Sequence, residues 1–202
     1  MTPPLIPVVV VTHEGPSERL SRCLEALRDA GGVGPVIVIN NSERESKSEA
    51  DLEDLYGAVL IRTANRGYGA AANDGFSEVR RLSPSATAIA LLNDDVTVAP
   101  GWIEGLSDAL AEGWNVAQPK LLMASSLAAD VALVNSVGVT LDRHGAGVDI
   151  GYGEPDSSVF DGIADIEIFT GGAVLFSRAF LDLTGGFDER FFLYYEDVDL
   201  AL

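Results

Sequence analysis

Cysteine is nearly absent from this 202-residue sequence, since only Cys23 is present, so an internal disulfide is excluded. The apolar helical spacing around Cys23 predicts a buried thiol in a reducing compartment, which favours a cytoplasmic location. Long apolar runs are also missing: no stretch of about 18 apolar residues occurs, and the N-terminus lacks the basic region of a signal peptide. We therefore expect no transmembrane segment.

Basic residues are scarce as well. There are 13 Lys and Arg against 31 Asp and Glu, which gives a net charge of -18 and a pI near 4.2. Such a field repels a nucleic-acid backbone, so no nucleic-acid partner is expected. It also opposes a bare diphosphate, so a phosphate ligand should bring a divalent cation or meet clustered backbone N–H groups.

Histidine is equally rare. His13 and His144 lie in polar loops without a cluster of other metal ligands, so both are interpreted as loop residues. Apolar residues make up 47% of the chain and charged residues 22%, which is ordinary for a soluble globular domain. The length suits one domain of α/β size.

Short apolar runs alternate with helix-period segments in the first half, a pattern typical of βαβ units around a mostly parallel sheet. Strands are predicted at 8–12, 36–39, 58–62, 88–92 and 116–121. A first helix should begin after an N-cap at Ser17 and end at Gly31, and others should span 69–82 and 101–112, the last with Pro100 in its first turn.

The second half is less regular. Gly-rich alternating runs after residue 122 predict hairpins and an ordered loop. A strand at 173–176, a helix capped by Ser177 and a break at Gly185 follow, and the sequence ends inside another helical pattern. We expect a chain truncated at its C-terminus.

Polar residues follow each of the first four predicted strands: 12–15, 40–42, 63–65 and 93–95. Because the carboxyl ends of parallel strands form one edge of the sheet, and ligands bind outside that edge, these segments should face a common cleft.

Two adjacent carboxylates, Asp94 and Asp95, end the fourth strand in "ALLNDDVTVAPGW". If the strand continues, only one can reach a bound cation, whereas a turn would let both approach. Their oxygens suit Mg²⁺ or Mn²⁺ that also binds a diphosphate. The alternative is that "NDD" merely forms a turn.

The segment "NRGYGAAANDG" follows the third strand, and Gly67 and Gly69 would let the backbone approach a ligand closely. It matches neither the dinucleotide fingerprint nor the phosphate loop. The alternative is a Gly-rich loop with capping asparagines.

A third acidic group, Glu196, Asp197 and Asp199, lies among the aromatic residues of "GGFDERFFLYYEDVDL". On a helix Asp197 and Asp199 differ by about 200°, so only one can face a cleft. A carboxylate partly desolvated by aromatic rings suits a general base. The alternative is that acids simply favour a helix N-terminus.

These motifs, in this order, resemble family 2 glycosyltransferases of the GT-A fold, especially the bacterial enzymes that transfer rhamnose or galactofuranose in envelope polysaccharide assembly. The resemblance covers almost the whole chain. It implies a three-layer α/β/α fold with a mostly parallel sheet in a single domain over 1–202, with a nucleotide-binding half at 1–122 and an acceptor and catalytic half at 123–202.

The resemblance also implies roles for individual residues. Those that would hold the nucleotide sugar are Thr12, Glu14, Asn40, Asn65, Gly67, Asn73, Asn93, Asp94, Gly171 and Gly172. Asp95 would bind the Mg²⁺ or Mn²⁺ ion, Asp197 would be the catalytic base, and Glu196 would contact acceptor or sugar. The family usually has an acidic residue near Asn40 that reads the pyrimidine, so this chain departs from the family pattern there.

The activity that the resemblance implies is metal-dependent, inverting transfer of a sugar from a nucleoside diphosphate sugar to a saccharide or lipid-linked saccharide acceptor. The enzyme would be cytoplasmic and peripheral at the inner membrane face. Two alternatives are a non-catalytic nucleotide-sugar-binding domain and a sugar nucleotidyltransferase, although "THEGPSE" after the first strand lacks the basic Gly-rich loop of the latter.

Overall fold

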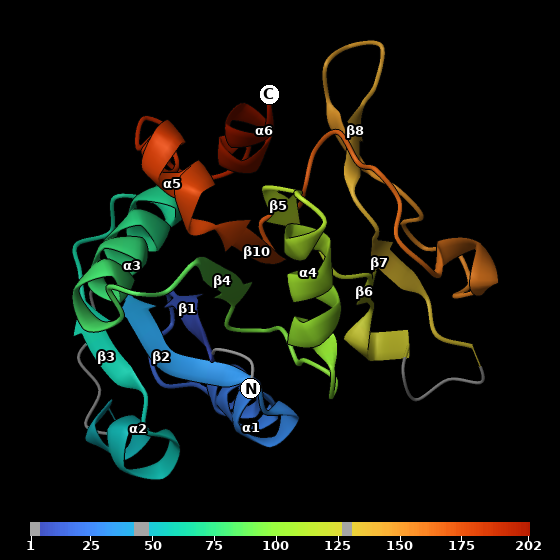
Figure 1. The fold of residues 1–202 in the computed structure, drawn as a ribbon. Helices are drawn as coiled ribbons and strands as arrows, with labels where there is room; N and C mark the ends of the chain where they lie inside the picture. The colour runs from blue at the N-terminus through green and yellow to red at the C-terminus, as the bar shows by residue number, and fades with distance from the viewer. Residues whose placement is uncertain (1–4, 43–48, 127–130) are drawn as a thin grey trace.

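The computed structural model describes residues 5–42, 49–126 and 131–202, and its centre is a six-stranded sheet (Figure 1). In spatial order the strands are β3 (Val59–Arg62), β2 (Val33–Asn40), β1 (Ile6–Thr12), β4 (Ala88–Asn93), β10 (Ala173–Ser177) and β5 (Val116–Ala117). The first four are parallel, and β10 is antiparallel to both its neighbours. The expected α/β class with a mostly parallel sheet is confirmed.

Helices cover both faces of this sheet (Figure 1). Residues of α1 (Glu18–Ala30), α2 (Glu49–Tyr56) and α4 (Trp102–Ala111) join one apolar core. Residues of α3 (Tyr68–Leu82), α5 (Arg178–Thr184) and α6 (Glu196–Ala201) join the other. The three-layer arrangement follows from these two cores, and α2 is a helix that the sequence pattern did not predict.

The valine run of β1 shows why the first strand is apolar without interruption. Val8 and Val10 lie in one core, and Val9 and Val11 lie in the other. All four are at most 6% exposed, because a central parallel strand is covered on both faces. Burial on both sides therefore fixes β1 in the middle of the sheet.

Capping residues set several helix ends as expected. The Ser17 hydroxyl accepts a hydrogen bond from the backbone N–H of Leu20, and the Ser177 hydroxyl accepts one from the backbone N–H of Phe180, at 3.2 Å in both cases. The start of α4 differs from the prediction: Gly101 is the N-cap with φ 82°, so Pro100 precedes the helix instead of occupying its first turn.

The strand predicted at 116–121 is wrong as a single element. β5 ends at Ala117, and β6 (Leu121–Leu122) pairs instead with β7 (Val134–Ser136) in a separate two-stranded sheet. Pro119 has no N–H to donate to a continuing ladder. After the last residue of β5, the side chain of Gln118 bonds to the backbone instead: its Oε1 accepts from the N–H of Thr170 at 2.7 Å.

The hairpins expected after residue 122 are confirmed. β6 and β7 form one antiparallel pair, and β8 (Val139–Leu141) and β9 (Gly147–Asp149) form another. Two single turns of 3₁₀ helix occupy Ala124–Ser126 and Ser158–Phe160. The chain then returns to the centre, where β10 inserts between β4 and β5 and brings the C-terminal segment next to the strand ends.

Candidate active site

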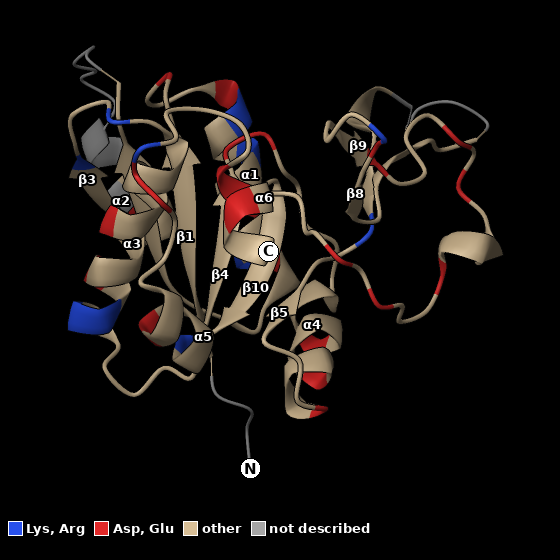
Figure 2. Cartoon of the chain, turned by 90° about the horizontal axis from the view of Figure 1, so that it is seen from above, with Lys and Arg blue, Asp and Glu red and all other residues tan. Residues whose placement is uncertain are grey.

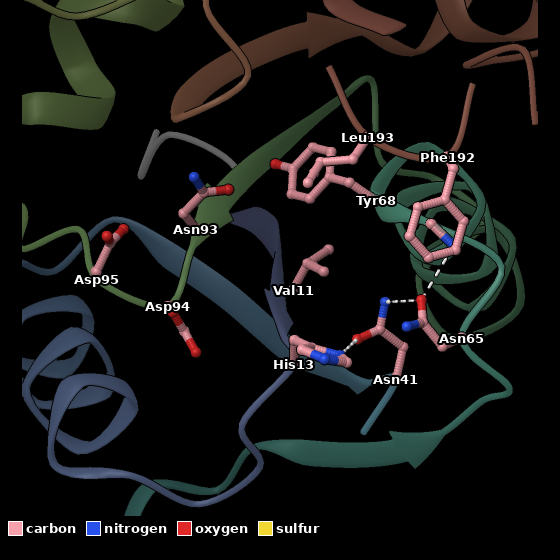
Figure 3. Close-up of a pocket in the computed structure, with 11 residues that line it drawn as sticks. Val11, His13, Asn41, Asn65, Tyr68, Asn93, Asp94, Asp95, Phe192 and Leu193 are labelled. Atoms are coloured by element: carbon pink, nitrogen blue, oxygen red, sulfur yellow. Dashed lines mark hydrogen bonds between the residues drawn. The ribbon is translucent and has the colours of Figure 1, made fainter. Parts of the chain in front are cut away.

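The carboxyl ends of the four parallel strands open into one pocket of about 320 Å³ (Figure 3). Each of the four polar segments predicted to share a cleft contributes to it, so that expectation is confirmed. The lining residues are Val11, His13, Asn41, Asn65, Gly67, Tyr68, Asn93, Asp94, Asp95, Phe192 and Leu193.

A turn at the end of β4 brings both adjacent carboxylates to this pocket. The N–H of Val96 donates to the carbonyl of Asn93 at 3.3 Å, and Asp94 and Asp95 lie within that turn. The side chain of Asp94 is directed toward β1, where its Oδ2 accepts from the buried hydroxyl of Thr12 at 2.5 Å. Asp95 is exposed and is therefore the carboxylate more available to a ligand.

Burial and hydrogen bonding shift the pKa of Asp94 in opposite directions. Partial burial raises the pKa of Asp94 above its ordinary value, while the Thr12 hydroxyl and the Arg19 guanidinium lower it less strongly. Beside it, Oδ1 of Asn93 is buried and finds no hydrogen-bond partner among the described residues. The pocket wall thus contains an acceptor oxygen with unused capacity next to two carboxylates.

Three polar side chains, running in Figure 3 from the lower centre of the pocket to the side away from Asp95, form a chain of hydrogen bonds. His13 Nδ1 lies 3.1 Å from Asn41 Oδ1, and Asn41 Nδ2 donates to Asn65 Oδ1 at 3.5 Å. Asn65 Oδ1 also accepts from the backbone N–H of Gly67 at 3.2 Å. His13 and Asn41 were not predicted as ligand-binding residues, although both lie in the strand-end segments that the sequence marked.

Gly67 has a packing role in addition to its place in the pocket. Its φ is 101°, and a Cβ built on it would lie 2.2 Å from the carbonyl oxygen of Phe192. The N–H of Tyr68 donates to that same oxygen at 3.0 Å. The loop before α3 and the segment before α6 are therefore in direct backbone contact, which places Phe192 and Leu193 in the pocket wall.

Tyr68 lies between the two acidic motifs and is a residue that the sequence reading missed. Its hydroxyl donates to the carbonyl of Gly171 at 2.7 Å. Desolvation raises the pKa of the Tyr68 phenol well above its ordinary value, and the charges of Glu196, Asp197, Asp95 and Asp94 raise it further, in that order. Tyr68 thus lines the pocket together with Asp94 and Asp95, and its ring lies next to Gly171, as does Asp197. The only sequence signal was its place in "NRGYG".

The three carboxylates at the start of α6 have different environments, and Figure 2 shows this acidic turn in red. Asp197 is partly exposed; its Oδ2 accepts from the N–H of Gly171 at 3.0 Å and its Oδ1 from Val198 at 2.9 Å. Glu196 is 6% exposed, and its Oε2 has no partner among the described residues. Asp199 is exposed, so the helical geometry separates Asp197 and Asp199 as predicted.

The aromatic surroundings expected for these carboxylates are arranged differently. Tyr194 and Tyr195 are 73% and 44% exposed, and their φ values of 69° and 67° are unusual for residues with side chains. The desolvated carboxylate is Glu196: burial raises its pKa, and the neighbouring charge of Asp197 raises it further, against a lowering backbone hydrogen bond. Asp197 itself does not line the 320 Å³ pocket but lies beside Gly171, next to Tyr68.

Six of the residues predicted to bind the nucleotide sugar do not line the pocket: Thr12, Glu14, Asn40, Asn73, Gly171 and Gly172. Glu14 is exposed and forms an ion pair with Arg19 at 2.5 Å. Asn40 is fully buried, and its Oδ1 accepts from the N–H of Ser42 at 2.9 Å. Asn73 bonds to the N–H and carbonyl of Phe187 at 3.0 and 2.9 Å, so it connects α3 to the segment before α6.

Gly171 and Gly172 connect the site to the sheet. The carbonyl of Gly172 accepts from the N–H of Asn93 at 3.0 Å, and Gly171 bonds to both Tyr68 and Asp197. A Cβ on Gly171 would lie 3.5 Å from the Tyr68 ring and 3.8 Å from Asp197 Oδ2. The turn before β10 is therefore the structural link between the pocket and the first turn of α6.

A larger hollow of about 700 Å³ lies between α4 and residues 159–166. It is away from the ends of the parallel strands, and the ammonium of Lys120 within it already pairs with Asp156 and Asp161 at 2.8 and 2.7 Å. The strand-end pocket, with its several titratable side chains, is the stronger candidate for chemistry.

The described ranges contain neither a preformed metal site nor a membrane-spanning helix. Across 5–42, 49–126 and 131–202, no group of three or more His, Cys, Asp and Glu side chains could hold a metal ion unaided. In the same part of the chain, none of the helices has the length and apolar character needed to cross a membrane. Cys23 is buried as predicted, and desolvation, with the charges of Asp94 and Asp95, raises its pKa to about 12.

Known proteins provide an independent comparison. Two curated Mycobacterium tuberculosis proteins, from strains H37Rv and CDC 1551, are each 28% identical over 98% of this chain and 69% of their own length. Both are named N-acetylglucosaminyl-diphospho-decaprenol L-rhamnosyltransferase.

Solved structures support the fold. The Staphylococcus aureus protein TarS (residues 1–349) matches with a TM-score of 0.60 and 11% identity, over 97% of this chain and 53% of that one. The Pyrobaculum calidifontis mannosyltransferase PcManGT, solved with GDP-Man and Mn²⁺, matches with a TM-score of 0.54 and 16% identity, over 92% and 48%. The chain spans about half the length of these structures, and it has the same GT-A fold. The family model described as glycosyl transferase family 2 matches residues 8–126, and the chain belongs to this family.

Proposed function

We propose that this chain forms the donor-binding and catalytic domain of an inverting glycosyltransferase. It transfers a sugar from a nucleoside diphosphate sugar to an acceptor hydroxyl during cell-envelope polysaccharide synthesis. The family and the names of the mycobacterial relatives support this proposal. The relatives' names also support a lipid-linked saccharide as acceptor, and such an acceptor is consistent with the peripheral location at the inner membrane face that we propose.

One observation carries the proposal: the two acidic motifs converge on Tyr68. Asp94 and Asp95, from the end of β4, line the same pocket as Tyr68, and the Tyr68 hydroxyl donates to the carbonyl of Gly171, whose N–H donates to Asp197 at the start of α6. A transferase needs one acidic group near the departing diphosphate and another near the attacking hydroxyl, with the sugar between them. The position of Tyr68, lining the pocket and bonded to Gly171, is consistent with this division.

The donor set in the pocket fits a divalent cation. Among the residues that the structure describes, no Lys or Arg lines this pocket to neutralise a diphosphate, and the oxygens of Asn93, Asp94 and Asp95 lie along one wall. Mg²⁺ and Mn²⁺ bind through a few carboxylate oxygens and complete their shell with phosphate and water. We propose Asp95 as the main ligand with Asp94 beside it; the ion, when bound, would supply charge stabilisation for the leaving diphosphate.

Asp197 is proposed as the general base. Its bonds to the N–H groups of Gly171 and Val198 fix the carboxylate in one orientation, and each oxygen keeps a free lone pair. In an in-line displacement Asp197 accepts the proton of the acceptor hydroxyl as that oxygen attacks the anomeric carbon, and the bond from this carbon to the diphosphate oxygen breaks on the opposite face. The configuration at that carbon is thereby inverted. Glu196, buried behind it, is proposed to hold the first turn of α6 in place.

The test is a panel of UDP-, TDP- and GDP-sugars incubated with the chain, with and without Mn²⁺ and with a lipid-linked saccharide acceptor. Donor binding is followed by calorimetry and diphosphate release by a coupled assay. Metal-dependent binding with turnover supports the full proposal. Binding without turnover would indicate a nucleotide-sugar-binding domain, and production of a sugar nucleotide from a triphosphate would indicate a nucleotidyltransferase. Absence of any metal-dependent binding would refute the proposal.

A further inference from the structure

The hydrogen-bond chain at the far end of the pocket fixes the position of each hydrogen in it. A backbone N–H can only donate, so the atom of Asn65 that faces Gly67 at 3.2 Å must be its oxygen. Because that oxygen only accepts, the Asn41 atom directed at it must be the amide nitrogen. The oxygen of Asn41 is then the atom that faces His13.

The tautomer of His13 follows from the same reasoning. Its Nδ1 lies 3.1 Å from an oxygen that can only accept, so Nδ1 must carry a hydrogen. In neutral imidazole the other nitrogen is then an acceptor. Nε2 of His13 has no partner among the described residues, and the ring is exposed in the pocket wall. The hydrogen-bond chain of Asn65, Asn41 and His13 therefore presents Nε2 of His13 as a hydrogen-bond acceptor to any ligand that occupies this part of the pocket.

The location of His13 identifies which part of a nucleotide sugar it would meet. In Figure 3, Asp94 and Asp95 lie at one side of the pocket and Asn65 at the other, with His13 and Asn41 between them, and the diphosphate would lie near Asp95 if a cation is held there. The nucleobase then extends toward His13, Asn41 and Asn65. This assignment rests on the proposed function.

We propose that Nε2 of His13 accepts a hydrogen bond from the ring N–H of the donor's nucleobase, and that Asn41 and Asn65 are positioning residues that hold His13 in the required tautomer. Uracil, thymine and guanine have such a ring N–H beside a carbonyl. Cytosine and adenine present an unprotonated ring nitrogen at that place, which would face another acceptor. His13 thereby selects the first group of bases.

The tautomer is tested by ¹⁵N NMR of the histidine side chains. Only two histidines are present, so a His144→Gln variant assigns the signals of His13. We expect protonated Nδ1 and unprotonated Nε2 for neutral His13. Asn41→Leu, which removes the acceptor, should shift the population toward protonated Nε2. Wild-type protein with predominantly protonated Nε2 would overturn the proposal.

Base selection is tested by calorimetry with UDP, TDP, GDP, CDP and ADP in the presence of Mn²⁺. The tightest ligand should be UDP, TDP or GDP, and His13→Phe should weaken its binding roughly tenfold while changing CDP and ADP little. His144→Gln is the matched control, because His144 is exposed in a turn outside the pocket, and it should bind like wild type.

The outcomes separate this inference from the proposed function. Metal-dependent binding in which CDP or ADP is tightest, or in which His13→Phe has no effect, would overturn the role of His13 and leave the transferase proposal intact. Failure of all five nucleotides to bind would overturn both.

Discussion

The contact between Gly67 and Phe192 predicts a specific stability defect in Gly67→Ala. Gly67 has φ 101° and ψ 174°, a conformation that is open almost only to glycine. An added Cβ would lie 2.2 Å from the carbonyl oxygen of Phe192 and 2.8 Å from its Cα. Since these are backbone atoms, no side-chain rotation can relieve the clash.

The expected cost has two parts. The backbone strain of a non-glycine residue in this region is about 1–3 kcal/mol. Moving Phe192 away would also break the hydrogen bond from the N–H of Tyr68, which contributes about 1 kcal/mol. Gly67→Ala should therefore lower the free energy of unfolding by roughly 2–4 kcal/mol. It should also weaken nucleotide binding, because Phe192 and Leu193 line the pocket.

Two other glycines provide matched controls for urea unfolding. Gly153 has φ 75° with no atom within 4 Å of an added Cβ, so Gly153→Ala measures backbone strain alone. Gly105 is inside α4, also without neighbours, and Gly105→Ala should stabilise the chain by up to about 1 kcal/mol. If Gly67→Ala loses no more stability than Gly153→Ala, the close packing of the two loops is refuted.

Three further predictions concern the carboxylates. Asp95→Ala should weaken Mn²⁺-dependent donor binding at least roughly tenfold by calorimetry, with Asp108→Ala on the exposed side of α4 unchanged. Asp197→Asn should keep donor affinity and reduce kcat about 10²- to 10⁴-fold, and unchanged turnover would remove Asp197 as the base. Burial raises the pKa of Glu196, so the folded state holds that proton more tightly and stability falls as pH rises above roughly 4. Glu196→Gln should thus be more stable than wild type at pH 7, and the two should have the same stability in acid. Asp199→Asn is the control and should not show this pH-dependent difference. If Tm changes with pH in the same way for Glu196→Gln and wild type, the prediction is contradicted.

The fold could be predicted where the apolar pattern of a segment also indicates the place of that segment in the sheet. The valines of β1 are apolar at every position because both faces are buried, so the strand and its central place are readable together. The segment at 116–121 was predicted as one strand because its apolar pattern does not reveal whether its two ends pair in the same sheet or in different sheets. Which partner each half takes depends on β10 and β7, which come much later in the chain.

The site was predictable at the level of segments and less so for single side chains. The strand-end rule identified four of the segments that line the pocket, but not the segment of Phe192 and Leu193, and it does not state which side chain in each loop faces inward. Asn40 and Asn41 show the difference. Asn40 is fully buried and bonds to Ser42, whereas Asn41 lines the pocket. Successive side chains at a strand end point to opposite sides, so only one of the two can meet a ligand.

Both acidic motifs likewise combine a more buried residue with a more exposed neighbour. Asp94 is bonded to Thr12 while Asp95 is exposed in the pocket, and Glu196 is buried while Asp197 is partly exposed beside Gly171. In each pair the first residue is held by the protein and the second remains open to solvent. Asp197 is oriented by the N–H groups of Gly171 and Val198, and Asp95 follows a carboxylate held by Thr12, so the more exposed acid of each pair keeps its capacity to bind a proton or a cation. The paired acids of this chain are therefore best understood as one structural and one chemical group each, which is why substituting the first should change stability and substituting the second should change activity.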